Sequence, residues 1–201
     1  DCLLSRGLGD VYKRQDNETF LTKTWLYENG LVDYVKVLAQ GQTLISSVKE
    51  PINFKDNIKL DRYDFSLNTA LLFTDDITTN IVSFANGVPT KDGGPHMEGF
   101  TQGITKAFND YLTNNKQLAK KLKLKGNLVQ SDIIEGIVAT FELKVPAEIA
   151  EFDGQTKEKL STAQAKKATF DIIYKQLSDW LFDHSKPVSY THLTLPTIYS
   201  V

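Results

Sequence analysis

The segment Phe65–Phe73 reads FSLNTALLF, and large apolar side chains occupy its first, third, seventh and ninth positions. This period of two is typical of a β-strand that buries one face in a core. The segment Ile137–Val145 reads IVATFELKV, alternates in the same way and is followed by Pro146, which ends it. We therefore expect two half-buried strands that share one sheet.

Apolar residues at helical spacing predict two long helices, over Phe100–Leu112 and Phe170–Leu181. A shorter helix is expected over Leu31–Leu38, directly after Asn29-Gly30. One-sided helices and alternating strands bury their apolar faces best against each other. The expected fold class is α/β (α+β), as a two-layer sandwich in a single domain with both long helices on one face of the sheet.

The remaining segments give weaker patterns. A strand is expected within Glu18–Glu28, and a connection over Gly41–Asp56 with a short strand near Leu44–Ser46. After the turn residues Thr74–Asp76, Asn80–Phe84 is expected to return beside Phe65–Phe73 as a hairpin.

The two ends of the chain differ in character from its middle. Asp10–Gln15 reads DVYKRQ, which the DNA sequence GATGTGTATAAGAGACAG encodes, and the reverse complement in another frame encodes Val188–His192, VSYTH. One DNA element flanking an insert on both sides explains this relation, and it resembles a transposase adapter. We expect 1–15 and 187–201 to be non-native scars that add nothing to the core, and the native domain to be 16–186.

Composition narrows the functional classes. The chain has 23 basic and 25 acidic residues, and leaving out the expected scars changes its net charge from −2 to −3. A globally basic nucleic-acid binder is therefore not indicated. The only cysteine, Cys2, lies in an expected scar, which excludes a disulfide framework or a thiolate metal site in 16–186. No apolar run approaches the roughly 20 residues that span a bilayer.

Two loops carry more glycine or charge than a connection needs. Asp92–Phe100 reads DGGPHMEGF, and glycines before a helix leave backbone N–H groups able to face an anion. Phe152–Leu160 reads FDGQTKEKL, in which Lys157 can reach a phosphate as a point charge. Taken singly, these are more simply a connection and a solvated lysine. His96 has no second histidine or acidic cluster beside it, so we expect a structural role.

Four motifs occur together in one order along the chain. They are YENGLVDYV at Tyr27–Val35, the glycine-rich loop, EGIVA at Glu135–Ala139, and QTKEKL at Gln155–Leu160. In this order and spacing they resemble the transducer domain of the ATPase subunit of bacterial type IIA topoisomerases, gyrase B and its topoisomerase IV counterpart. The resemblance covers nearly all of 16–186.

The resemblance implies a fold like that of domain 2 of ribosomal protein S5, in an enzyme that couples ATP hydrolysis to passage of one DNA duplex through another. It implies that Lys157 contacts the γ-phosphate of ATP, as a catalytic and cofactor-binding residue, and that Gln155 lies close to the nucleotide. ATP would be bound mainly by a neighbouring domain outside this chain. Mg²⁺ would act in the intact enzyme without a ligand from this chain.

The same resemblance implies the partners and the cellular location. They are double-stranded DNA, a second copy of the ATPase subunit that forms a homodimer gate, and the DNA-cleaving partner subunit, in the cytoplasm and without a membrane. The chain would be part of an isomerase. Alone it is expected to be inactive, because the family's acidic general base, magnesium-binding asparagine and nucleotide lid do not occur in 16–186.

Three residues depart from the family pattern. Asn29 stands where glycine is usual, which makes the match at that motif less complete. Pro95 stands where threonine is usual, so the glycine-rich loop is free to run differently there. Thr101 stands where an arginine often faces transported DNA, so whether this face contacts DNA stays open. The lysine-rich segment 116–125 is either a solvated face or a phosphate contact.

Two other interpretations stay open. One is a stand-alone interaction module with an S5-like fold, and the other is the middle domain of a mismatch-repair or chaperone ATPase. Gln155-Thr156-Lys157 together with the glycine-rich loop favours the topoisomerase over both. Gyrase and topoisomerase IV are equally compatible with these motifs.

Overall fold

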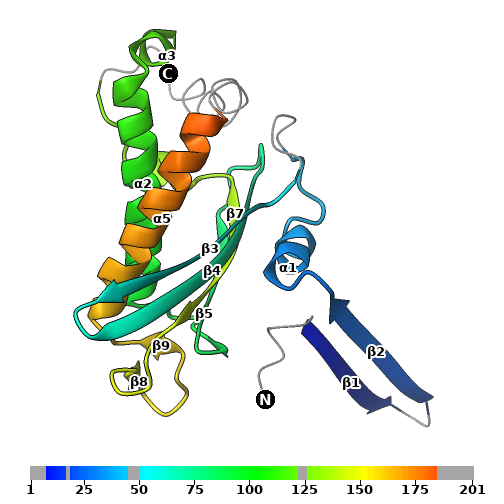
Figure 1. Cartoon of the computed structure of the whole chain (residues 1–201). Helices are drawn as coiled ribbons and strands as arrows, with labels where there is room; N and C mark the ends of the chain where they lie inside the picture. Colours follow the sequence, from blue (N-terminus) through cyan, green and yellow to red (C-terminus); the bar gives the residue numbers. More distant parts are fainter. Residues whose placement is uncertain (1–7, 17–18, 45–49, 122–125, 185–201) are drawn as a thin grey trace.

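A five-stranded sheet is the centre of the computed structural model, which describes residues 8–16, 19–44, 50–121 and 126–184 (Figure 1). Its strands are β3 (Ile52–Leu60), β4 (Tyr63–Phe73), β5 (Asn80–Ala85), β6 (Val88–Pro89) and β7 (Ile137–Lys144). They lie in the order β3-β4-β7-β5-β6. All neighbours are antiparallel except β5 and β7, which are parallel.

The two strands predicted from alternation are direct neighbours. β4 pairs with β7 so that Leu71 lies opposite Ala139, which confirms the shared sheet. The predicted hairpin of β4 with β5 is wrong, because β7 lies between them. The central place suits β7, since its residues from Ile137 to Leu143 are all buried. A strand buried on both faces belongs inside a sheet rather than at its edge.

The strand β3 was not predicted, since Gly41–Asp56 was expected to be mostly a connection. It pairs with β4 across a tight turn in which Asp61 has a φ of 55°. The missed signal was again a period of two, in which apolar residues alternate with polar ones, Asn53, Lys55, Asn57 and Lys59. Of the strand expected near Leu44–Ser46, Leu44 forms a single bridge to Thr74, and 45 and 46 lie outside the described residues.

Both long helices pack on one face of the sheet, as predicted (Figure 1). They are α2 (Pro95–Asn114) and α5 (Gln164–Asp183). Phe100 of α2 stacks on Phe141 of β7, with ring centroids 4.3 Å apart. The two helices also cross closely, because a Cβ atom on Gly99 would collide with the carbonyl oxygen of Lys166. The absence of a side chain at Gly99 is therefore what lets the backbones approach.

A smaller core lies on the opposite face of the sheet. The helix α1 (Leu31–Leu38), at the predicted position, buries Leu31 and Val35 against Leu72 of β4 and Val138 of β7. The sandwich of sheet and paired helices is thus the main layer pair, and α1 covers part of the second face. Two short helices, α3 (Lys116–Lys121) and α4 (Gln130–Ile134), belong to the connection that leads from α2 to β7.

The N-terminal strands form a separate unit. Among the described strands, β1 (Leu8–Asp16) pairs with β2 (Thr19–Tyr27) alone, and Figure 1 shows this hairpin extending away from the five-stranded sheet. The described part of the expected N-terminal scar, 8–15, therefore adds no strand to the central sheet, whereas 1–7 and 187–201 lie outside the described residues. The foreign origin of both segments stays a prediction. In the described part of the chain, no helix is long and apolar enough to cross a membrane.

Candidate functional site

The segment around Lys157 forms a small hairpin. β8 (Phe152–Asp153) pairs with β9 (Lys159–Leu160), where sequence reasoning expected an irregular polar loop. Gly154 and Lys157 both adopt positive φ angles, of 74° and 56°, and so bend the tip sharply. Gln155, Thr156 and Lys157 are all exposed there. The hairpin thus presents an amide and an ammonium group to solvent.

The hairpin lies directly beside the glycine-rich loop that precedes α2. The backbone N–H of Asp92 donates to the carbonyl of Glu158 at 3.0 Å, and that of Leu160 donates to the carbonyl of Gly93 at 3.1 Å. A Cβ on Gly94, whose φ is 134°, would collide with the Leu160 carbonyl oxygen. The structure therefore brings together the two loops that the sequence singled out, and their backbones are joined.

The first turn of α2 begins immediately after this junction. Gly94 is the N-cap and Pro95 is the first helical residue, a position where proline loses no hydrogen bond. The N–H groups of Met97 and Glu98 donate to the carbonyl of Gly94. Pro95 therefore starts the helix at a position that proline tolerates well.

His96, in the first turn of α2, is wholly buried. Its Nε2 lies 2.9 Å from the hydroxyl of Thr90, which in turn lies 2.7 Å from the hydroxyl of Ser83 on β5. Its ring meets Phe141 edge-on, and burial lowers the pKa of the His96 imidazole to about 4. No hydrogen-bond partner for Nδ1 occurs among the described residues. A neutral histidine that ties the glycine-rich loop to the sheet fits the structural role expected for it.

The charged residues of the hairpin are paired selectively. Asp153 lies 3.6 Å from Lys159, and Glu158 lies 3.7 Å from Lys91. Lys157 forms no ion pair within the described part of the chain, and its Nζ lies 5.9 Å from the centroid of the Phe152 ring. The ammonium group of Lys157 is therefore available to an anion from outside.

The residues that depart from the family pattern have local roles. Thr101 is buried, and its hydroxyl lies within hydrogen-bond distance of the carbonyls of Met97 and Glu98, so it is satisfied within its own helix. The backbone and side chain of Asn29 donate to the Asp33 carboxylate, which holds the pKa of Asp33 below its usual value and fixes the start of α1. Of the lysine-rich segment, Lys116 and Lys120 are exposed, and 122–125 lie outside the described residues.

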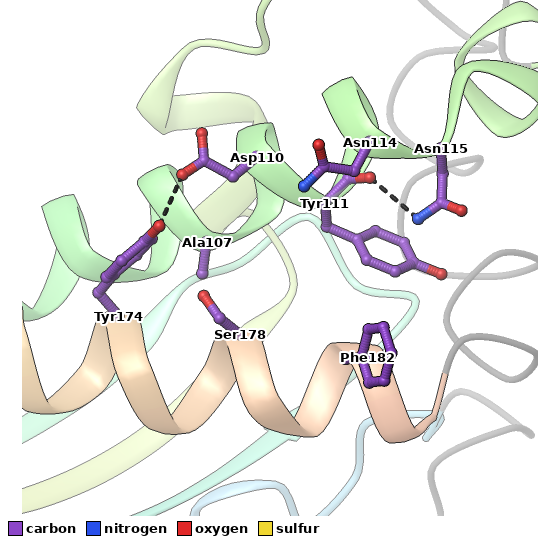
Figure 2. A pocket seen from close by; sticks show the side chains of 8 residues that line it. All are labelled: Ala107, Asp110, Tyr111, Asn114, Asn115, Tyr174, Ser178 and Phe182. Carbon is purple, nitrogen blue, oxygen red and sulfur yellow. Dashed lines mark hydrogen bonds between the residues drawn. The ribbon is translucent and has the colours of Figure 1, made fainter.

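A cavity that the sequence did not predict lies between the C-terminal halves of α2 and α5 (Figure 2). It has a volume of about 570 Å³. The Tyr174 hydroxyl donates to Asp110 at 2.9 Å, and Lys106 donates to the other oxygen of the same carboxylate at 2.6 Å. This polar group is internally satisfied, and the cavity lies toward the opposite end of α2 from Gly94. Among the described residues, no three metal-ligating side chains cluster.

Comparison with known proteins identifies the class to which this fold and these loops belong. The sequence model of the DNA gyrase B family matches residues 30–190. The chain is 37% identical over 158 residues to the B subunit of DNA topoisomerase 4 from Mycoplasma capricolum and 35% identical over 159 residues to that of Bacillus subtilis. Each match covers 79% of this chain and 23% of the relative.

The chain therefore belongs to the DNA gyrase B family, which confirms the predicted relation to type IIA topoisomerase B subunits. It spans about a quarter of the length of these curated relatives. The membership favours the topoisomerase interpretation over a stand-alone module or a mismatch-repair or chaperone ATPase.

Solved structures show the same fold. The 43K ATPase domain of Thermus thermophilus gyrase B, in complex with an aminocoumarin, superposes with a TM-score of 0.67 at 24% identity, over 90% of this chain and 46% of that one. The topoisomerase IV ATP-binding domain of Francisella tularensis gives a TM-score of 0.64 at 22% identity, over 92% and 46%.

Proposed function

We propose that this chain is the transducer segment of a bacterial type IIA topoisomerase B subunit. In this proposal the Gln155-Thr156-Lys157 loop reaches the γ-phosphate of ATP held by the neighbouring ATPase domain. The observation that carries the proposal is the exposed ammonium of Lys157, which lacks a carboxylate partner in the described residues and sits at the tip of a hairpin hydrogen-bonded to the loop that precedes α2. In this role the segment would couple ATP hydrolysis in the neighbouring domain to the passage of one DNA duplex through another.

The chemistry of the loop suits a terminal phosphate. A lysine ammonium acts as a compact positive charge with three donors, and it stabilises negative charge that develops on the phosphoryl oxygens. Once ATP is hydrolysed and the γ-phosphate leaves, that attraction is lost. Lys157 would therefore have two roles: it would stabilise charge during hydrolysis, and its contact would report whether the γ-phosphate is present. Gln155 would lie beside it as a further hydrogen-bond donor.

The backbone links provide a route from the phosphate to the domain. A pull on Lys157 acts on Glu158 and Leu160, whose backbones are hydrogen-bonded to Asp92 and Gly93. Gly93 is followed directly by the cap of α2, a helix of 20 residues. A local contact can thus move a rigid element instead of only a loop.

The proposal includes the cofactors and partners of the whole protein. ATP and Mg²⁺ would be held by the neighbouring domain, and this chain would supply only the Gln155-Thr156-Lys157 loop. The partners would be double-stranded DNA, a second copy of the B subunit and the DNA-cleaving subunit, in the cytoplasm.

The test is steady-state ATP hydrolysis by the intact B subunit that carries Lys157→Ala. We expect the rate to fall on the order of 10²-fold, since one charged contact in a dry phosphate site is worth a few kcal/mol. The free energy of unfolding should stay the same, because Lys157 is exposed. Lys157→Arg should restore activity only in part, because a planar guanidinium presents its donors differently.

A matched control is Lys167→Ala, which removes an exposed lysine from α5. Hydrolysis by this variant should equal that of the unmodified subunit. Unmodified turnover in Lys157→Ala would remove this lysine from the mechanism and with it the proposed function.

A further inference from the structure

The Lys157 ammonium lies over the face of an aromatic ring in the same hairpin. Its Nζ is 5.9 Å from the centroid of Phe152, the first residue of β8. A cation within about 6 Å of a ring centroid is attracted by the negative face of the ring. The contact is local, because five positions separate the two residues and the turn between them brings them together.

The carboxylates near Lys157 pair with other lysines, so the Phe152 ring is the attractive group beside its ammonium. The hairpin itself contains Lys157 and Lys159, and Lys91 lies beside it. The carboxylates of Glu158 and Asp153 pair with Lys91 and Lys159. Within the described part of the chain, the attractive group beside the Lys157 ammonium is thus the aromatic ring and not a carboxylate.

The backbone at Lys157 is also held in an unusual state. A φ of 56° is in the left-handed region, which is unfavourable for a residue with a side chain. The pairing of β8 with β9 holds both ends of the loop and so imposes this conformation. The direction in which the lysine leaves the loop is therefore set by the hairpin, and it leads to the ring.

We propose that Phe152 is a positioning residue that provides a resting place for Lys157 when no phosphate is bound. This inference rests on the proposed role of Lys157. To reach a phosphate on another domain, the ammonium must leave the ring, so the contact with Phe152 competes with nucleotide engagement. A contact made only in the unengaged state lowers apparent affinity for the nucleotide in proportion to its strength.

The contact itself is tested in this chain by NMR. The ε-CH₂ protons of Lys157 should be shifted upfield by the ring, and Phe152→Leu should return them to the shift of a solvated lysine. Phe152→Tyr should keep the upfield shift, while Phe182→Leu, which alters an aromatic residue 82% exposed at the end of α5, should not change it. Lys157 protons at the ordinary shift, or insensitive to Phe152→Leu, would overturn the inference.

The consequence is tested in the intact B subunit, by titration with a non-hydrolysable ATP analogue. Phe152→Leu should tighten binding about two- to five-fold, the range of an exposed cation–π contact, and Phe152→Tyr should not. In the Lys157→Ala background, Phe152→Leu should have no effect. An equal effect in both backgrounds, or none in either, would refute the competition. If Lys157→Ala hydrolyses ATP normally, the proposed function fails, whereas the NMR result still decides whether the contact exists.

Discussion

Acidification should weaken the fold through one buried histidine, His96. Its imidazole is fully buried against Thr90 and Phe141, and burial lowers its pKa to about 4 in the folded protein. In the unfolded chain the pKa is about 6.5. Below pH 6.5 the unfolded chain therefore binds a proton that the folded chain refuses. The contribution of neutral His96 to the free energy of unfolding is fully present above pH 6.5. It is lost as the pH falls from 6.5 to 4 and changes no further below pH 4.

The size of this effect follows from the shift in pKa. A difference of one pKa unit corresponds to about 1.4 kcal/mol, so the whole shift is worth about 3 kcal/mol. Between pH 7 and pH 4.5 the expected loss is about 2 kcal/mol, because neither titration is complete at these limits. For a domain of this size that is a substantial part of a free energy of unfolding of about 5–15 kcal/mol.

The assay is urea denaturation at pH 7 and pH 4.5, with His96→Gln as the comparison. Glutamine keeps a polar group near Thr90 but does not titrate, so its own destabilisation is the same at both pH values. Other groups titrate in both proteins; for example, burial raises the pKa of Glu142, which acts in the opposite direction. The loss of unfolding free energy between pH 7 and pH 4.5 is therefore compared between the unmodified chain and His96→Gln, and the difference between the two losses is the contribution of His96. Equal losses in the unmodified chain and in His96→Gln would refute the reasoning.

Three further predictions concern packing, ligand binding and the chain ends. Gly99→Ala should destabilise the fold by about 1–3 kcal/mol in urea denaturation, because its Cβ would collide with the backbone of α5. Gly126→Ala is the control and should change little, because a Cβ there meets no atom within 4 Å. Equal effects of the two substitutions would contradict the tight crossing of α2 and α5. The isolated chain should bind ATP negligibly in a calorimetric titration, since one lysine does not form a nucleotide pocket, and micromolar binding would show that the domain is misassigned. Removing 1–15 and 187–201 should leave the midpoint of urea unfolding unchanged, and a large drop would show that these ends are part of the fold.

Alternation and helical spacing predicted the elements that form the main core. Each of these elements, β4, β7, α2 and α5, buries at least one face lined with apolar residues. The regular spacing of those apolar residues can be read directly from the sequence. The pairing of β5 was mispredicted for a different reason. Its true neighbour, β7, is distant in sequence, and periodicity within a segment contains no information about which segment it meets. β3 was missed because its exposed face is rich in Lys and Asn, which lowered its apparent strand character.

The candidate site was predictable in position but not in construction. Lys157 was singled out through a resemblance of motifs, since an exposed lysine alone has no distinguishing chemistry. The two-residue strands on either side of it are too short to give a period. The hydrogen bonds that join Asp92 and Gly93 to the hairpin are made by backbone atoms. Because every residue has these atoms, no pattern of side chains predicts the bonds.

The insertion of β7 between β4 and β5 has a consequence for the order in which the protein assembles. A contact such as that of Thr69 with the Thr140 carbonyl joins positions 71 residues apart. During synthesis β3, β4, β5 and β6 leave the ribosome before β7. Until β7 docks between them, β4 and β5 each expose an unpaired edge. Such edges are templates for pairing with other chains. Substitutions that slow the arrival or docking of β7 should therefore raise aggregation during synthesis more than they lower the stability of the finished fold.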